Sequence, residues 1–278
     1  MLHSVFRVML MERALVTLTP YESRRLIGRA VANMEVVRKA YREGIIVIAT
    51  SISTAYVAEE LLGISMEKEK FTYGVVSKGR LCVTPKNNRP RPIVIKRGRI
   101  LKNTGYEILE EFEPDDVFIK GANAIDPYGN VGVLAASPTG GTLGNALRYL
   151  LSRGSHIIVP IGLEKLIPIP IHEAAEHTGI YYYKYSTGMY AALIPVPRAK
   201  PVTEIEAYQI LFNVRAIPIA AGGVSGSEGS ITLVLEGSEE NVKKAFEYTM
   251  SIKGEPKLPS YTENCKKCEW PCGLRSEK

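Results

Sequence analysis

The sequence alternates between short apolar runs and longer segments in which apolar residues recur every three or four positions. Residues 45–49, 117–120 and 157–161 are almost entirely apolar, which is typical of strands covered on both faces of a parallel sheet. Residues 20–42 have helical periodicity and begin with Thr-Pro-Tyr-Glu, a capping box with proline at the first helical position. The pattern therefore predicts an α/β fold: a parallel sheet with helices on both faces.

A different period interrupts this pattern between residues 71 and 101, where apolar and polar residues alternate. Lys-Gly at 78–79 and Arg-Gly at 97–98 separate β-forming stretches, as in β-hairpins. We therefore expect an antiparallel β-hairpin insertion at about residues 66–112.

The last third of the chain predicts the order helix, strand, strand, helix. The helices lie at residues 203–212 and 238–250, and one of the strands lies at 230–235. The proline-rich stretch before them is the best candidate for a linker. The predicted organisation is an α/β domain over residues 1–197 that contains the insertion, a small α+β unit over 198–257, and a cysteine-bearing tail over 258–278.

The composition and the lengths of the apolar runs indicate where in the cell the protein lies. No apolar run reaches the roughly 20 residues needed to span a bilayer, and the apolar N-terminal stretch is interrupted by charges and lacks a small-residue cleavage site. We therefore predict a cytoplasmic protein without a membrane-spanning segment. Gln209 is the one glutamine among many Glu, Lys, Arg, Ile and Val residues, a composition typical of thermophilic proteins.

The net charge of +6 is concentrated in one segment. Residues 86–102 contain seven basic residues and no acidic residue, so the rest of the chain is close to neutral. Such a basic β arm could bind the phosphates of a nucleic acid. The alternative is a solvated hairpin whose lysines and arginines protect its edges, and the absence of interleaved aromatic residues favours this alternative.

Two loops are candidates for binding an anion. The first follows the apolar run at 45–49 and precedes a predicted helix, and its hydroxyl residues are Thr50, Ser51, Ser53 and Thr54. Hydroxyls and free backbone amides at a helix N-terminus form a site for phosphate or carboxylate. The alternative is ordinary capping of the helix by Ser53, which needs one hydroxyl only.

The second loop is rich in glycine and precedes a helix predicted at 143–151. Its candidate ligand-binding residues are Gly140, Gly141, Thr142 and Gly144. Glycines allow the backbone to approach a ligand closely, although a tight turn capped by Thr142 is the alternative. Because ligands of parallel sheets bind at the carboxyl ends of the strands, we expect both loops to contribute to one site.

The stretches GANAIDPYGN, SPTGGTLGNAL and HIIVPIGLEK resemble the core of the ribose-5-phosphate isomerase / glucosamine-phosphate deaminase / CoA-transferase-like superfamily. The resemblance covers roughly residues 20–170, with the insertion unmatched. It implies an α/β fold, and it implies that the loop at residues 50–54 holds a substrate phosphate. The motifs are more specific for the fold than for a reaction.

This sequence departs from the superfamily pattern at residues that matter for catalysis. Asn123 replaces the first aspartate of the turn, Ala124 replaces its glutamate, and Asp126 keeps the second aspartate. Asn123 cannot act as a general base, so it is a candidate for binding a ligand. If the protein is an enzyme, Asp126 is the acid/base candidate and Lys165 the candidate for stabilising charge. An Asx turn before Pro127 explains Asp126 equally well.

The tail contains Cys265, Cys268 and Cys272 in the spacing C-x2-C-x3-C. Thiols that cluster in a cytosolic chain favour a metal site, either zinc or an iron–sulfur cluster. The fourth ligand could be Cys82, a histidine or a partner chain. A disulfide and unliganded thiols are the alternatives.

Together these features predict a protein that binds a small phosphorylated or carboxylated metabolite, as a sugar-phosphate isomerase-like or CoA-transferase-like enzyme or without catalysis. The alternative is a regulatory or nucleic-acid-associated protein that uses the basic arm and a metal-binding tail. A row of tyrosines at residues 181–185 is interpreted as a β-strand surface or an oligomer contact, and a homo-oligomer is expected.

Overall fold

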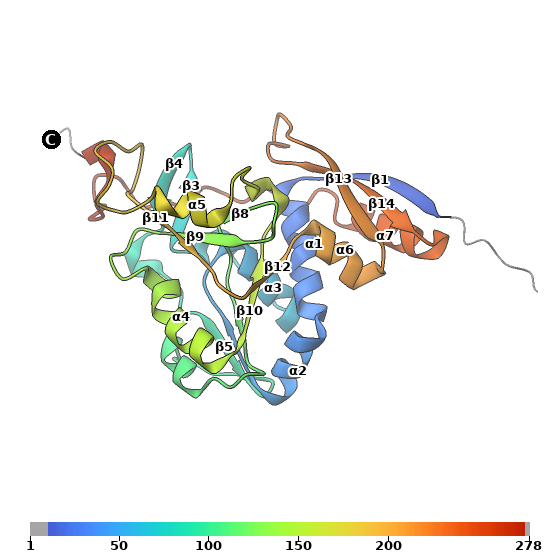
Figure 1. The fold of residues 1–278 in the computed structure, drawn as a ribbon, viewed down its shortest axis with the longest axis horizontal. Helices are drawn as coiled ribbons and strands as arrows, with labels where there is room; N and C mark the ends of the chain where they lie inside the picture. Colours follow the sequence, from blue (N-terminus) through green and yellow to red (C-terminus); the bar gives the residue numbers. More distant parts are fainter. Residues whose placement is uncertain (1–10, 276–278) are drawn as a thin grey trace, which may run out of the picture.

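The computed structural model describes residues 11–275, and a six-stranded sheet forms its centre (Figure 1). The strands follow one another across the sheet in the order β12 (Ala199–Val202), β10 (His156–Pro160), β7 (Val117–Ile119), β2 (Ile45–Ile48), β5 (Ile93–Lys96) and β6 (Arg99–Ile100). The first four run parallel, whereas β5 lies antiparallel to β2, and β6 lies antiparallel to β5. The predicted parallel α/β core is therefore confirmed.

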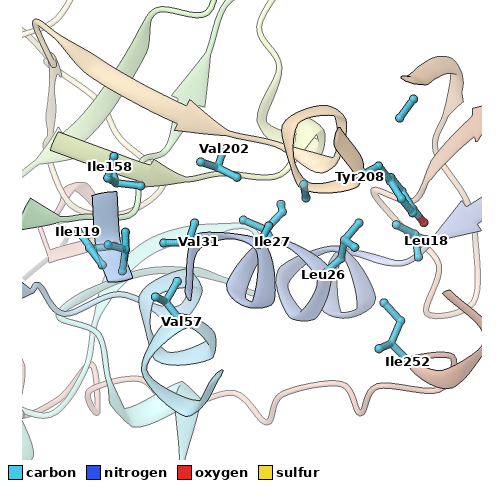
Figure 2. Packing of buried hydrophobic residues seen from close by; sticks show 14 of the residues in the cluster. Leu18, Leu26, Ile27, Val31, Val57, Ile119, Ile158, Val202, Tyr208 and Ile252 are labelled. Atoms are coloured by element: carbon cyan, nitrogen blue, oxygen red, sulfur yellow. The ribbon is translucent and has the colours of Figure 1, made fainter. Parts of the chain in front are cut away.

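Helices cover both faces of this sheet. Those that matter for the site are α1 (Pro20–Asn33), α3 (Ile52–Leu62), α4 (Gly141–Arg153) and the short helix η3 (Tyr106–Glu111). On β2, Ile46 and Ile48 point into a core shared with α1 and α3, part of which is drawn in Figure 2. Ile45 and Val47 point into the opposite core, with α4 and η3. Because alternate side chains enter two cores, the strand carries no polar residue.

The helix predicted over residues 20–42 is two helices. The capping box of α1 is present, with Thr19 and Glu22 bonded to each other's backbone amides. Met34 then adopts an extended conformation (φ −60°, ψ 136°), and α2 (Glu35–Glu43) begins after it. The apolar period continues across the break, so the sequence pattern alone could not reveal this bend.

A second, three-stranded antiparallel sheet adjoins the core. It consists of β1 (Glu12–Leu18), β14 (Ile231–Gly237) and β13 (Arg215–Ala221), with β14 in the middle. The helices α6 (Glu204–Phe212) and α7 (Glu239–Ser251) accompany it (Figure 1). The predicted order helix, strand, strand, helix of the last third is confirmed by α6, β13, β14 and α7. The unit is completed by β1 from the N-terminal part, which pairs with β14 along its whole length.

Both predicted hairpin turns are present, but their strands belong to different sheets. The turn at Lys78 and Gly79 joins β3 (Gly74–Ser77) to β4 (Arg80–Val83) in a separate two-stranded hairpin. The turn at Arg97 and Gly98 joins β5 to β6, which extend the main sheet rather than forming part of an insertion. All four turn residues have positive φ, between 48° and 75°, as the tight turns of hairpins require.

The basic segment is largely engaged within the protein. Four of its side chains have partners: Lys86 with Glu269, Lys96 with Glu111, Arg91 with the Asn103 carbonyl, and Arg89 between the rings of Tyr73 and Trp270. This arrangement agrees better with the alternative of a protected hairpin edge than with a free arm.

The remaining elements are a small sheet, a short helix and single turns. They are the sheet of β8 (Ala124–Ile125), β9 (Val131–Ala135) and β11 (Ala192–Pro195), helix α5 (Ile171–Glu176), and the single turns η1 (Lys68–Lys70), η2 (Lys86–Asn88), η4 (Leu163–Lys165) and η5 (Gly273–Arg275). The strand expected at the tyrosine row is wrong, because Tyr181 and Tyr182 lie in a turn and Tyr185 in irregular chain, with each side chain at least three-quarters exposed. In the described part of the chain, no helix is long and apolar enough to cross a membrane.

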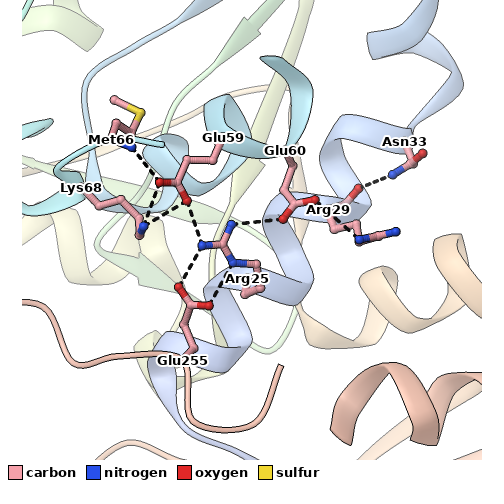
Figure 3. A network of polar contacts seen from close by, with 8 residues as sticks. All are labelled: Arg25, Arg29, Asn33, Glu59, Glu60, Met66, Lys68 and Glu255. Atoms are coloured by element: carbon pink, nitrogen blue, oxygen red, sulfur yellow. Dashed lines mark hydrogen bonds and ion pairs between the residues drawn. The ribbon is translucent and has the colours of Figure 1, made fainter. Parts of the chain in front are cut away.

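A polar network ties the chain after α7 to α1 and α3 (Figure 3). Its centre is Arg25, whose guanidinium donates to the carboxylates of Glu59, Glu60 and Glu255 at 2.8–3.1 Å. Lys68 adds a further pair of hydrogen bonds to Glu59 at 2.9 and 3.0 Å. The network fixes the direction in which the tail leaves α7.

Candidate functional site

The connections that follow β2 and β7 leave the sheet on opposite faces. After β2 the chain enters α3, which packs in the first core, whereas after β7 it passes through β8 and β9 into α4, which packs in the second core. Since β2 and β7 are adjacent and parallel, their carboxyl ends border a topological switch point, where open α/β sheets bind ligands.

The hydroxyl loop at the end of β2 is held by its own side chains. Ser51 caps α3 by accepting a hydrogen bond from the Thr54 amide at 3.1 Å, and Thr54 donates to the Ala49 carbonyl at 2.5 Å. The capping residue is therefore Ser51 and not Ser53. Among residues 11–275, no acceptor is bonded to the amides of residues 51–53. These free amides therefore place partial positive charge at the N-terminus of α3.

The glycine loop provides a second set of free amides. Gly140 and Gly141 have φ of 71° and 60°, a conformation that favours glycine, and no side chain caps α4. A Cβ at Gly144 would overlap the Thr139 carbonyl, so the turn requires a glycine there too. Within the described residues, the amides of residues 141–143 have no hydrogen-bond acceptor. The alternative of capping by Thr142 is therefore wrong, because α4 begins at Gly141.

Tyr106 connects the two loops. Its ring packs against Phe118 of β7 with the ring centroids 6.4 Å apart. Burial raises the pKa of the Tyr106 hydroxyl, and the neighbouring hydroxyls of Thr50 and Thr142 partly oppose this rise. The hydroxyl oxygen is shielded from solvent and, within the described residues, makes no hydrogen bond of ordinary geometry to either threonine. The loops after β2 and before α4 therefore meet at one buried, unpartnered phenol.

Two lysines lie on the neighbouring strand ends. Lys120 follows β7 and donates to the Gly121 carbonyl at 3.3 Å, and Lys165 in η4 donates to the Ala122 carbonyl at 2.9 Å. Burial, followed by the charge of Lys165, lowers the pKa of Lys120 to about 8. Burial also lowers the pKa of Lys165, although the nearby charges of Glu164 and Glu204 oppose part of this fall. Neither ammonium forms an ion pair with a carboxylate of residues 11–275, so both would be stabilised by a bound anion.

The other two candidates from the Gly-Ala-Asn turn have structural partners. Asp126 accepts hydrogen bonds from the amides of Tyr128, Asn130 and Ile171 and from the Asn130 side chain, all at 2.9–3.0 Å. Burial alone would raise the pKa of Asp126, but these hydrogen bonds lower it. This geometry is that of the Asx turn that the sequence left open. Asn123 accepts a hydrogen bond from the Leu134 amide at 3.0 Å and thereby holds the β8–β9 connection.

Sequence reasoning missed a buried acidic pair at the ends of β10 and β12. Glu204 is fully buried, and burial followed by the nearby charge of Glu164 raises its pKa to about 7. Arg24 donates to one oxygen of Glu164 at 3.0 Å, and the Leu163 amide donates to one oxygen of Glu204 at 2.9 Å. The remaining oxygen of each carboxylate is buried without a hydrogen-bond donor in the described residues. The available signal was the capping box that begins at Thr203, which places Glu204 in the first turn of α6.

We expect Gly121→Ala to disturb the hydroxyl loop. A Cβ at position 121 would overlap Ser51 Oγ, and Ser51 could move away only by giving up its cap on α3. Loss of a cap costs about 1 kcal/mol, so the free energy of unfolding should fall by about 1–2 kcal/mol in chemical denaturation. Gly74→Ala is the matched control, since nothing lies within 4 Å of a Cβ there. Equal stability of the two variants would contradict this close contact.

Two surface cavities lie near these elements. One, of about 310 Å³, adjoins the glycine loop and is lined by Ala135, Ser137, Pro138, Gly140, Ile180, Tyr181, Ala192 and Ile194, without residues of the hydroxyl loop. The other, of about 490 Å³, is lined by the predicted ligands Cys265, Cys268 and Cys272 together with Cys82. Across residues 11–275, no three His, Cys, Asp or Glu side chains converge closely enough to hold one metal ion.

The predicted site residues thus fall into three groups. The loops containing Thr50–Thr54 and Gly140–Gly144 meet at Tyr106; Lys165 lies beside Lys120 on the adjoining strand ends; and the cysteines lie apart from both, on the tail and the β3–β4 hairpin. No family model, curated protein or solved structure matches the chain, so the assignment of this site depends on its geometry.

Proposed function

We propose that the protein binds a small phosphorylated or carboxylated metabolite at the carboxyl ends of β2 and β7. The observation that carries this proposal is the meeting of the two loops at the unpartnered hydroxyl of Tyr106. The loops belong to helices on opposite faces of the sheet, and each offers free amides at a helix N-terminus. Backbone amides and helix dipoles in this arrangement favour an anion.

The lysines supply the charge for the same ligand. Lys120 and Lys165 are desolvated and lack a carboxylate partner among the described residues, so an anion would relieve the cost of burying their charges. A lysine with a pKa near 8 is also suited to polarise a carbonyl group or to exchange a proton with it. This chemistry fits the sugar-phosphate and acyl-CoA substrates that the superfamily resemblance implies. The proposal gives Asp126 a structural role and assigns the charge-stabilising role to the lysine pair.

The rival function, binding of nucleic acid by residues 86–102, has weaker support. Four of the seven basic side chains in that segment already contact other parts of the protein. Arg97, Arg99 and Lys102 stay exposed on the rim of the sheet. Nucleic-acid affinity that falls steeply with salt concentration would favour the rival.

The test is a thermal-shift measurement with ribose 5-phosphate, glucosamine 6-phosphate and acetyl-CoA, with unphosphorylated ribose as the ligand control. At a ligand concentration about 100 times Kd, stabilisation is about 2.7 kcal/mol, which raises Tm by several degrees. Lys120→Met should weaken binding at least about tenfold, because it removes a charge-assisted hydrogen bond. Lys200→Met, which removes an exposed lysine from β12, should leave binding unchanged.

The pH dependence of binding adds a second readout. Lys120 must be protonated to attract the anion, so affinity should be highest below pH 8 and should fall as the pH rises through 8. This fall should be absent in Lys120→Met. If none of the anions changes Tm, or if Lys120→Met binds as tightly as the wild type, the proposed site is wrong.

A further inference from the structure

The four cysteines of the chain surround one cavity, although they are far apart in the sequence. Cys82 lies on β4, opposite Val75 of β3, and the other three lie on the C-terminal tail. Burial raises the pKa of the Cys82 thiol, and the charges of Cys265, Cys272 and Cys268 raise it further. All four thiols are free, so none is used in a disulfide.

Backbone hydrogen bonds hold the tail against the hairpin on both sides of these thiols. Before them, the Glu263 amide donates to the Val83 carbonyl at 2.7 Å. After them, Cys272 pairs with Met189, and the Gly273 amide donates to the Gly188 carbonyl at 2.9 Å. The Met189 amide in turn donates to the Leu81 carbonyl at 3.0 Å. The tail is therefore docked beside β4, and residues of both line the surface cavity.

The turn that carries the first two tail cysteines is also fixed. The Asn264 carbonyl accepts hydrogen bonds from the amides of Lys267 and Cys268 at 2.9 and 2.8 Å, and the Asn264 side chain accepts one from the Lys266 amide at 2.9 Å. This closed turn presents Cys265 and Cys268 from one side. Lys266 also lines the cavity.

The spacing of the thiols distinguishes between the two metal centres that four cysteines can hold. A structural zinc ion needs four sulfurs at about 2.3 Å from one point. Among residues 11–275, no three His, Cys, Asp or Glu side chains approach one point so closely, although all four thiols line one surface cavity. An iron–sulfur cluster also takes four cysteine thiolates but is itself a multi-atom group, so its ligands stand farther apart.

We propose that Cys82, Cys265, Cys268 and Cys272 bind an iron–sulfur cluster that fastens the C-terminal tail to the β3–β4 hairpin. Each thiol loses its proton and binds an iron atom as the thiolate. Cys82 is the fourth ligand that the spacing of the tail left undefined. The histidines and partner chains considered as alternatives are not needed, because His156, His172 and His177 do not line this cavity.

The test is to purify the full chain without oxygen, reconstitute it with ferric iron, sulfide and a thiol reductant, and measure bound iron, acid-labile sulfide and visible absorption. The wild type should be brown and contain stoichiometric iron and sulfide. Cys82→Ser and Cys268→Ser should each lose most of the iron and the visible absorption. Val75→Ser is the matched control, since it changes the residue opposite Cys82 but keeps all four thiols.

Circular dichroism should show that the variants remain folded, so that loss of the cluster is not loss of the fold. A colourless protein with one bound zinc ion would overturn the proposal, as would a protein that binds neither metal. Retention of the full cluster by Cys82→Ser would overturn the assignment of the fourth ligand. Loss of the cluster in Val75→Ser would also overturn the assignment of Cys82, because it would show that cluster binding depends on the structure of the hairpin rather than on the Cys82 thiol.

Discussion

Replacing Glu204 with glutamine is expected to increase the free energy of unfolding by about 3 kcal/mol at pH 8 and by little at pH 4. The pKa of Glu204 rises from the ordinary 4.5 to about 7 on folding, because the side chain is buried beside Glu164. The folded protein therefore holds a proton between pH 4.5 and 7 that the unfolded chain has released. Above pH 7 the folded state must bear a desolvated negative charge.

The difference between the folded and unfolded pKa of Glu204 sets the direction in which pH changes the stability. Glu204 lowers the stability of the wild type as the pH rises from about 4.5 to 7, whereas Glu204→Gln carries no charge at any pH and keeps that stability. Glutamine can still accept the hydrogen bond from the Leu163 amide, and its own amide can donate to the unpartnered oxygen of Glu164. Urea denaturation of both proteins at several pH values measures the difference.

The control is Glu239→Gln, which removes an exposed carboxylate from the first turn of α7. Loss of its interaction with the helix dipole should change the unfolding free energy by less than about 1 kcal/mol. A Glu204→Gln variant that is less stable than the wild type at pH 8 would contradict this prediction. It would mean that the Glu204 charge is compensated in the folded state.

Arg25→Met should destabilise the protein by about 3 kcal/mol, the low end of the range for breaking a buried ion pair. The side chains of Arg25 and Glu59 are 17% and 7% exposed, so removal of the guanidinium leaves poorly solvated carboxylates behind (Figure 3). Lys68 still compensates Glu59, but Glu255 loses its arginine. Chemical denaturation measures the loss.

Lys39→Met is the control for Arg25, since it breaks an ion pair with Asp115 whose two side chains are about half or more exposed. Exposed pairs contribute about 0–1 kcal/mol, so this variant should remain close to the wild type. The explanation fails if Arg25→Met costs no more than Lys39→Met. A large cost should be accompanied by faster proteolysis after α7, because Glu255 connects that segment to α1.

Much of the fold could be predicted because the relevant signals are local. The apolar run of β2, the capping box of α1 and the hairpin turn at Lys78 and Gly79 each depend on neighbouring residues. Pairing between distant segments could not be predicted in this way. The pairing of β1 with β14 and the addition of β5 to the main sheet depend on contacts that no local pattern specifies.

The site was predicted in part for the same reason. Both loops were recognisable, because glycines and hydroxyls before a helix are a local signal. Tyr106 and Lys120 were missed, since their importance comes from where the fold brings them. Asp126 has a familiar motif position, but only the structure reveals that four N–H donors occupy its oxygens.

The most direct test of the proposed function is a crystal structure of the protein with ribose 5-phosphate. The account predicts a phosphate at the carboxyl ends of β2 and β7, within hydrogen-bond distance of the amides of residues 51–53 or 141–143, with Lys120 beside the ligand. A phosphate bound instead along residues 86–102, or no bound phosphate at saturating ligand, would contradict the proposed site.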